Sequence, residues 1–237
     1  MKLHAIPHPS CLRQATFPPG EGLAAPYKKV MQIRNKKINF LGDSITEGCC
    51  ATDNFGFVEI LGKYYGLAAA RNYGIGGTRI ARQRIPSLLG REDGDFCGRF
   101  RDMDPDADVI LVFGGTNDHG HGTAPVGEKS DRTPDTFTGA CHYLFAGLKE
   151  AFPNAKIVVA TPLHRADENR DDGITLEDYV NHIRRIAGEH HLPLLDLYAS
   201  SAICRETLET LTTDGLHPND EGHRILAREV AGFLETL

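Results

Sequence analysis

The segment KINFLGDSITEG, residues 37–48, joins a short apolar run to a polar turn and the start of a helix. Residues 37–42 have the length and composition of a buried strand, which Gly42 brings to an end. Asp and Ser are preferred where helices begin, so Asp43 and Ser44 predict a helix start. A strand that leads directly into a helix is the repeating unit of a parallel sheet covered by helices.

Four more apolar runs continue this pattern, over residues 68–74, 108–115, 156–162 and 192–198. Helical patterns lie between and after them, over 55–66, 134–152, 175–191 and 220–237. Thr133 with Pro134 predicts the start of the second of these helices, and Pro218 the start of the last. We therefore expect a three-layer α/β/α fold with a doubly wound, parallel, five-stranded sheet in the flavodoxin-like order 2-1-3-4-5.

Length and composition indicate one globular domain. The chain has 237 residues, 41% hydrophobic and 24% charged, which suits a single sizeable core. Residues 1–30 contain scattered Pro and Gly with no hydrophobic period, so we expect an irregular N-terminal extension before a domain over 31–237.

Charge and hydropathy narrow the possible partners. The net charge of −6 provides no broad basic surface for nucleic acid. No apolar run approaches the roughly 20 residues of a membrane span, and the first residues lack a secretory signal, so no membrane partner and a cytoplasmic location are expected. The six cysteines form no CxxC pair and are expected to be reduced and mostly buried, with Cys49 and Cys50 nearest to any motif.

Three polar segments follow the first three strands, where ligands bind in doubly wound sheets. Ser44 follows the first strand and could be a nucleophile or an ordinary helix cap. NYGIGGT, residues 72–78, could offer the backbone N–H of Gly77 to an oxyanion, with Gly76 as the alternative donor, or could be only a tight turn. Asn117 in GGTND, residues 114–118, carries a neutral donor for developing negative charge, although Asn is also common in turns.

A fourth segment, TTDGLHPND at residues 212–220, lies near the C-terminus. His217 could act as a general base for a serine if Asp214 orients its other ring nitrogen. Each of the four signals is weak by itself. Together they would bring a nucleophile, oxyanion donors and an oriented base to one edge of the sheet.

These four segments resemble, in order and spacing, the four sequence blocks of the SGNH (GDSL-type) hydrolase family. GDS at 42–44, NxGxxG at 72–77, GxND at 115–118 and DxxHP at 214–218 carry the resemblance, which spans about residues 37–237. It implies that Ser44 is the nucleophile, His217 the base and Asp214 the third member of a triad. It also implies an oxyanion hole formed by Ser44, Gly77 and Asn117, with no metal and no cofactor.

The predicted function is therefore hydrolysis of a small-molecule carboxylic ester through an acyl-enzyme. Polar loops after the third and fourth strands favour a short acyl group on a polar or carbohydrate-like alcohol, with Asp43, Asp118 and His119 as candidate substrate contacts. The family also permits thioesterase or lysophospholipase activity.

Two alternatives come from other functional classes. Asp118, His119 and His121, with Asp43 as a further ligand, could hold Zn²⁺ or Mn²⁺ in a metal-dependent phosphoesterase. The crevice could instead bind carbohydrate without turnover. Neither alternative gives His217 and the oxyanion donors a role.

Overall fold

A computed structural model describes residues 33–237, so the predicted N-terminal extension lies outside the described residues. The chain runs β1 (Lys37–Gly42), α1 (Ser44–Glu47), η2 (Thr52–Asn54), α2 (Phe57–Tyr64), β2 (Ala69–Gly74), η3 (Gly90–Asp93), α3 (Phe96–Arg99), η4 (Phe100–Asp102), β3 (Val109–Phe113), α4 (Thr116–His121), α5 (Phe137–Ala151), β4 (Lys156–Ala160), α6 (Leu176–Glu189), β5 (Leu194–Leu195), α7 (Leu197–Ser200), α8 (Leu208–Leu211) and α9 (Asp220–Leu234). Here α denotes an α-helix, η a 3-10 helix and β a strand.

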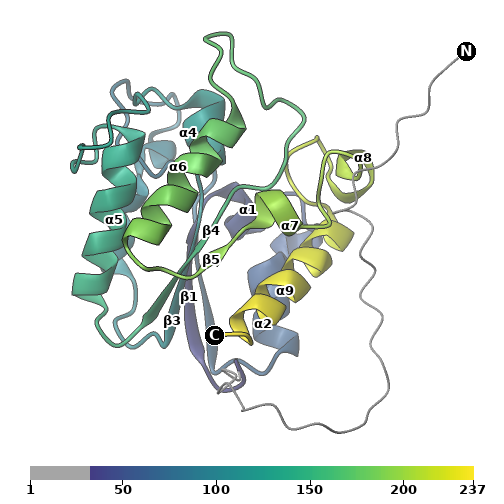
Figure 1. Ribbon diagram of the computed structural model, residues 1–237. Helices are drawn as coiled ribbons and strands as arrows, with labels where there is room; N and C mark the ends of the chain where they lie inside the picture. Colours follow the sequence, from purple (N-terminus) through teal and green to yellow (C-terminus); the bar gives the residue numbers. More distant parts are fainter. Residues whose placement is uncertain (1–32) are drawn as a thin grey trace, which may run out of the picture.

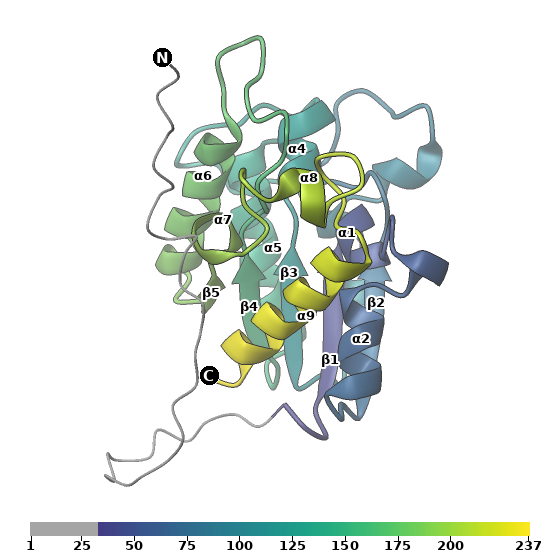
Figure 2. The ribbon, with the colours of Figure 1, turned by 90° about the vertical axis from the view of Figure 1, so that its right-hand side faces the viewer.

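The five strands form one parallel sheet in the order β2-β1-β3-β4-β5, which confirms the predicted fold. Helices α2 and α9 cover one face and α5 and α6 the other (Figure 1). Figure 2 looks onto the face that α9 crosses. In the described part of the chain, no helix is long and apolar enough to cross a membrane.

Strand residues alternate between two hydrophobic cores, because successive side chains of a strand point to opposite faces. On β3, Val109, Leu111 and Phe113 enter the core beneath α2 and α9. Ile110 and Val112 enter the core beneath α5 and α6. Burial on both faces explains why this strand is apolar throughout.

Two predicted boundaries are wrong: the end of the fifth strand and the start of the helix that follows the third strand. The fifth strand has only two residues, Leu194–Leu195, because the side chain of Asp196 caps α7 by accepting from the N–H of Ala199. Helix α5 begins at Phe137 rather than at Pro134, because Thr136 is its N-cap and accepts from the N–H of Gly139.

The last helix begins at Asp220, as its helical pattern predicts, and not at Pro218. The side chain of Asn219 caps α9 at Asp220 by accepting from the N–H groups of Glu221 and Gly222. Pro218 lies before the cap, in an antiparallel bridge with Thr212. This bridge closes the loop that carries Asp214 and His217.

Helices α1, α4 and α8 all lie at the carboxyl edge of the sheet (Figure 1).

Candidate active site

Ser44 is the first residue of α1 and follows the end of β1 at Gly42 after the single residue Asp43. The carboxylate of Asp43 caps this short helix by accepting from the N–H of Ile45 at 3.0 Å. The cap of α1 is therefore Asp43 and not Ser44, which leaves the hydroxyl of Ser44 free to face another partner. Ser44 Oγ lies 2.9 Å from His217 Nε2.

The loop from Thr212 to Pro218 brings His217 to Ser44. Its ends are held by the Thr212–Pro218 bridge and by the hydrogen bond from the N–H of Thr213 to the carbonyl of His217. Asp214 Oδ2 lies 2.7 Å from His217 Nδ1, and Asp214 Oδ1 accepts from the N–H of His217 at 2.8 Å. The three side chains thus form a continuous chain of hydrogen bonds.

The pKa of Asp214 reflects this arrangement. Partial burial alone would raise it, but hydrogen bonds from the backbone N–H and ring of His217 outweigh burial and lower it below its ordinary value. Asp214 therefore carries a negative charge at neutral pH. A carboxylate on Nδ1 holds the imidazole in the orientation that leaves Nε2 facing Ser44.

The loop after β2 lies against Ser44, since a Cβ on Gly76 would be 3.6 Å from the Cβ of Ser44. The N–H of Gly76 donates to Glu47 Oε2 at 2.6 Å, so this group is occupied inside the protein. Gly77 has φ of +77°, and its N–H makes no hydrogen bond to any residue in the range 33–237. Of the two alternatives, Gly77 is therefore the one with an available N–H.

Asn117 lies in the first turn of α4, which follows β3 through Gly115 at φ +108°. The residue is buried, and its side-chain amide donates to the carbonyl of Thr78 at 3.0 Å. One amide hydrogen is thus used to fix the side chain against the loop of Gly77. The second amide hydrogen remains for a ligand.

The sequence pattern of the GDSL-like lipase/acylhydrolase family matches residues 40–225. This match covers most of the chain and includes all four polar segments. The chain belongs to this family. It is accordingly an esterase or lipase of the GDSL type, a carboxylic ester hydrolase.

Individual proteins share the sequence or the fold of this chain. The GDSL lipase Rv0518 of Mycobacterium tuberculosis is 26% identical over 211 residues, 86% of this chain and 84% of that protein. A protein from Lactobacillus plantarum is 28% identical, with a TM-score of 0.73 over 86% of this chain and 98% of its own. A lipase/acylhydrolase from Enterococcus faecalis, 22% identical, shares the fold with a TM-score of 0.61 over 84% of this chain and 95% of its own.

Asp43 and Asp118, two of the residues predicted to contact substrate, form their hydrogen bonds within this GDSL hydrolase. Asp118 is buried, and its two oxygens accept from the N–H groups of Ile80 and Ala81, each at 2.9 Å. Burial raises the pKa of Asp118 to about 7 and that of Asp43 to about 6. These contacts favour structural roles: Asp118 holds the segment after Gly77, and Asp43 caps α1.

The histidines of α4 are not arranged as the alternative metal-dependent reading requires. His119 is buried with its ring edge-on to Tyr179, and burial lowers its pKa. Among residues 33–237, the one group of three side chains with metal-ligand geometry is Cys49, Cys50 and His217. The proposed phosphoesterase ligands Asp118, His119 and His121 are not brought together in such a group.

Two features of the site were missed by the sequence analysis. Glu47 accepts from Gly76 with one carboxylate oxygen and from Arg91 Nη2, at 2.5 Å, with the other. The thiols of Cys49 and Cys50 lie beside His217. Burial raises the pKa of Cys49 to about 11, so this thiol is protonated at neutral pH and is a poor nucleophile.

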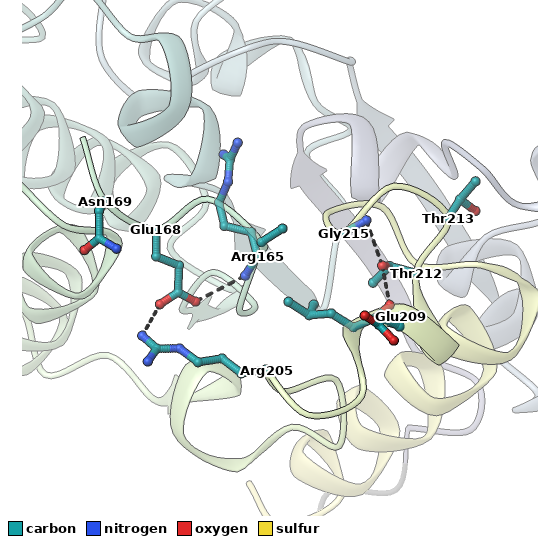
Figure 3. Close-up of a pocket in the computed structure, with 10 residues that line it drawn as sticks. Arg165, Glu168, Asn169, Arg205, Glu209, Thr212, Thr213 and Gly215 are labelled. Atoms are coloured by element: carbon teal, nitrogen blue, oxygen red, sulfur yellow. Dashed lines mark hydrogen bonds and ion pairs between the residues drawn. The ribbon is translucent and has the colours of Figure 1, made fainter. Parts of the chain in front are cut away.

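A groove of about 760 Å³ lies beside the loop that carries Asp214 (Figure 3). Polar and charged residues dominate its lining, among them Arg165, Asn169, Arg205 and Glu209. Ser44 and His217 are not among the lining residues, but Thr213 and Gly215, on either side of Asp214, are. The groove is therefore next to the site rather than part of it.

Glu168 organises one wall of this groove. Its carboxylate accepts from His164 Nδ1 at 2.6 Å and from the hydroxyl of Tyr198 at 3.1 Å, and it pairs with the guanidinium of Arg205 (Figure 3). Burial alone would raise the pKa of Glu168, but these bonds lower it to about 2. Glu168 is thus a charged, fully paired structural residue.

Proposed function

We propose that Ser44 is the nucleophile of a carboxylic ester hydrolase in which His217 is the general base and Asp214 orients it. The observation that carries the proposal is the chain of short contacts, 2.9 Å from Ser44 Oγ to His217 Nε2 and 2.7 Å from His217 Nδ1 to Asp214 Oδ2. Contacts of this length allow proton transfer from the hydroxyl to the imidazole.

Three donors are proposed to stabilise the oxyanion: the N–H groups of Ser44 and Gly77 and the side-chain amide of Asn117. The Ser44 N–H lies at the start of α1 and makes no hydrogen bond to any residue of the described chain, as is usual for the first N–H groups of a helix. All three donors are neutral, and the surrounding contacts hold Asn117 and the Gly77 loop in fixed positions. Such fixed dipoles lower the energy of the transition state without reorganisation.

The reaction proceeds in two acyl-transfer steps. Ser44 Oγ attacks the ester carbonyl as His217 Nε2 takes the hydroxyl proton, and the imidazolium then gives that proton to the leaving alcohol. Water next attacks the acyl-Ser44, with His217 again taking a proton and returning it to Ser44 as the acid leaves. The negative charge of Asp214 stabilises the imidazolium in both steps.

We propose a short acyl group on a polar or carbohydrate-like alcohol as the substrate. The groove next to the Asp214 loop supports this choice, because guanidinium, carboxylate, amide and hydroxyl groups line it and can bind a hydroxyl-rich leaving group. Its volume of about 760 Å³ is sufficient for one or two sugar rings.

A matched panel of esters tests the proposal. Acetyl and octanoyl esters of p-nitrophenol compare acyl length, and acetylated monosaccharides and oligosaccharides compare alcohols. We expect acetyl esters to be preferred, and Asn169→Ala to raise KM for the acetylated saccharide with no change for p-nitrophenyl acetate. An unchanged KM of Asn169→Ala for the acetylated saccharide, or the same relative change in KM for both substrates, would remove the groove from the proposal. Ser44→Ala serves as the inactive control.

A second candidate is hydrolysis of longer acyl or lysophospholipid esters. Ile85, Leu88 and Leu89 are exposed on the loop between β2 and α3. That loop reaches the site, since Arg91 pairs with Glu47 and a Cβ on Gly77 would contact the side chain of Glu92. A preference for octanoyl over acetyl that is lost when Leu88 and Leu89 are both changed to Ser would favour this candidate.

A further inference from the structure

The two adjacent cysteines are fixed beside the proposed base by the turn that ends α1. Gly48, at φ +94°, reverses the chain, and the N–H of Cys49 donates to the carbonyl of Ser44 at 2.9 Å. His223 Nε2 lies 3.3 Å from the carbonyl of Cys49. The backbone of Cys49 is thus held at both its N–H and its carbonyl, one turn from Ser44.

The thiols and the imidazole are close enough to share one ion. Cys49 Sγ and Cys50 Sγ lie 3.8 Å apart, and one ligand atom from each of Cys49, Cys50 and His217 lies within 4.8 Å of the others. Zinc–sulfur bonds of about 2.3 Å and zinc–nitrogen bonds of about 2.0 Å in a tetrahedron place two sulfurs ~3.8 Å apart and a sulfur and a nitrogen ~3.6 Å apart. The sulfurs already have this separation, and His217 needs to approach by at most ~1.2 Å.

The three side chains are also accessible. Cys50 is exposed, and Cys49 and His217 are partly exposed. The other described cysteines, Cys97, Cys141 and Cys204, are buried. A thiophilic ion in solution can therefore reach the Cys49–Cys50 pair without a change of fold.

We propose that Cys49, Cys50 and His217 form a binding site for one thiophilic d¹⁰ ion, Zn²⁺ or Cd²⁺, whose occupancy blocks the proposed base. Each thiol releases its proton to solvent when it binds the ion, and a water molecule completes the tetrahedron. Coordination by Nε2 removes the contact with Ser44, and coordination by Nδ1 removes the contact with Asp214. Either mode takes His217 out of the hydrogen-bonded chain.

The chemistry of the ligands defines which ions bind. Two thiolates and an imidazole favour Zn²⁺ and the softer Cd²⁺, whereas Mg²⁺, Ca²⁺ and Mn²⁺ prefer oxygen ligands. Since binding must displace thiol protons, ions with weak affinity for thiolate do not compete. The ion is an inhibitor of this hydrolase and not a cofactor.

The binding test is independent of ester hydrolysis. The full chain is reduced, freed of metal and titrated with Cd²⁺ by isothermal calorimetry and by the ultraviolet sulfur-to-cadmium charge-transfer band. Both the heat signal and the absorbance band are expected to show that one equivalent of Cd²⁺ binds per chain. Cys49→Ala and Cys50→Ala are each expected to lower the affinity by more than ~10-fold, since even outer partners of a metal contribute about 10- to 100-fold.

Two further variants complete this test. His217→Ala is expected to weaken binding while keeping the charge-transfer band, because both sulfurs remain. Cys11→Ser is the matched control for a cysteine outside the described residues, and it is expected to bind as the unaltered chain does. An absent band, or a band that Cys11→Ser abolishes and Cys49→Ala leaves intact, would overturn the site.

The inhibition test rests on the proposed function. Zn²⁺ is expected to inhibit p-nitrophenyl acetate hydrolysis reversibly, with full recovery on adding a chelator and no effect of Mg²⁺ at the same concentration. Each variant is compared with its own metal-free rate, and Cys50→Ala is expected to lose the inhibition. Cd²⁺ binding without any ester hydrolysis would refute the proposed function alone, and hydrolysis with undiminished activity at saturating Cd²⁺ would refute the inhibitory site alone.

Discussion

Replacing Glu47 by Ala is expected to lower kcat about 10- to 100-fold with little change in KM. Glu47 Oε2 accepts from the N–H of Gly76 at 2.6 Å, and Oε1 accepts from Arg91 at 2.5 Å. A hydrogen bond to a charged group contributes about 1.5–3 kcal/mol. About 1.4 kcal/mol corresponds to a tenfold change in rate. Loss of the Glu47–Gly76 hydrogen bond is expected to displace the neighbouring N–H of Gly77, and a cost of this size gives the stated range of kcat.

Two further variants distinguish the hydrogen bond between Glu47 and Gly76 from the exposed ion pair between Glu47 and Arg91. Glu47→Gln keeps one carbonyl acceptor for Gly76 and is expected to stay within about 5-fold of the unaltered kcat. Arg91 is more than half exposed, and exposed pairs contribute about 0.2–1 kcal/mol, so Arg91→Ala is also expected to cost at most about 5-fold. Glu47 is thus a positioning residue whose effect passes through Gly76.

The assay is steady-state hydrolysis of p-nitrophenyl acetate, with thermal unfolding measured for each variant. Glu221→Ala is the matched control, because Glu221 forms a similar exposed pair with Arg224 on α9 and its carboxylate makes no hydrogen bond to Ser44, Gly76 or His217. A folded Glu47→Ala variant with unaltered kcat, or one in which only KM changes, would refute the reasoning.

Three more variants test the site and the groove beside it. Asn117→Ala is expected to lower kcat about 10²- to 10³-fold at similar KM, because an oxyanion donor is lost; a change below fivefold in single-turnover hydrolysis would exclude Asn117 from that role. Asp214→Asn is expected to lower kcat at least ~10²-fold, because the amide no longer holds the imidazole in the required tautomer, and burst kinetics should show slower acylation. The pKa of Glu168 is about 2, below its ordinary 4.5, so its ionised form stabilises the fold above pH 4.5 and this stability is lost as pH falls toward 2. Glu168→Gln should therefore lower the free energy of unfolding by about 3 kcal/mol at pH 7, and the difference in urea unfolding should shrink at pH 3; a difference independent of pH would contradict the charge-based explanation.

The central part of the fold was predictable because its signals are local. The strand over residues 37–42 matches β1 at both ends, since the apolar run ends at Gly42 and the cap Asp43 follows. The third strand ends at Phe113, two residues before the predicted end, because Gly115 takes a positive φ that turns the chain into α4. Hydrophobic pattern and turn residues decide these boundaries within a few positions of the chain.

The start of α5 and the end of β5 depend on which of several nearby side chains caps the helix. Thr133 and Thr136 are both plausible caps for α5, and the sequence does not show which side chain reaches a free N–H group. In the structure Thr136 does so. The last strand is short for a similar reason, because Asp196 begins a helix before the apolar run ends.

Contacts between distant segments were beyond the sequence analysis. Glu47 meets Gly76 across 29 positions, and its role depends on how the loop after β2 folds back onto α1. The buried partners of Asp118 are likewise 37 and 38 residues away. A carboxylate beside a motif looks the same in sequence whether it faces substrate or holds backbone N–H groups.

The most direct test of the proposed mechanism is labelling with an organophosphate. The full-length protein is treated with a fluorophosphonate, its intact mass is measured, and the adduct is located by peptide mapping while residual ester hydrolysis is followed. We predict a single adduct on Ser44, loss of hydrolysis in proportion to labelling, and no adduct on the Ser44→Ala variant. Undiminished hydrolysis by Ser44→Ala, or an adduct at another residue that tracks the loss of activity, would contradict Ser44 as the nucleophile.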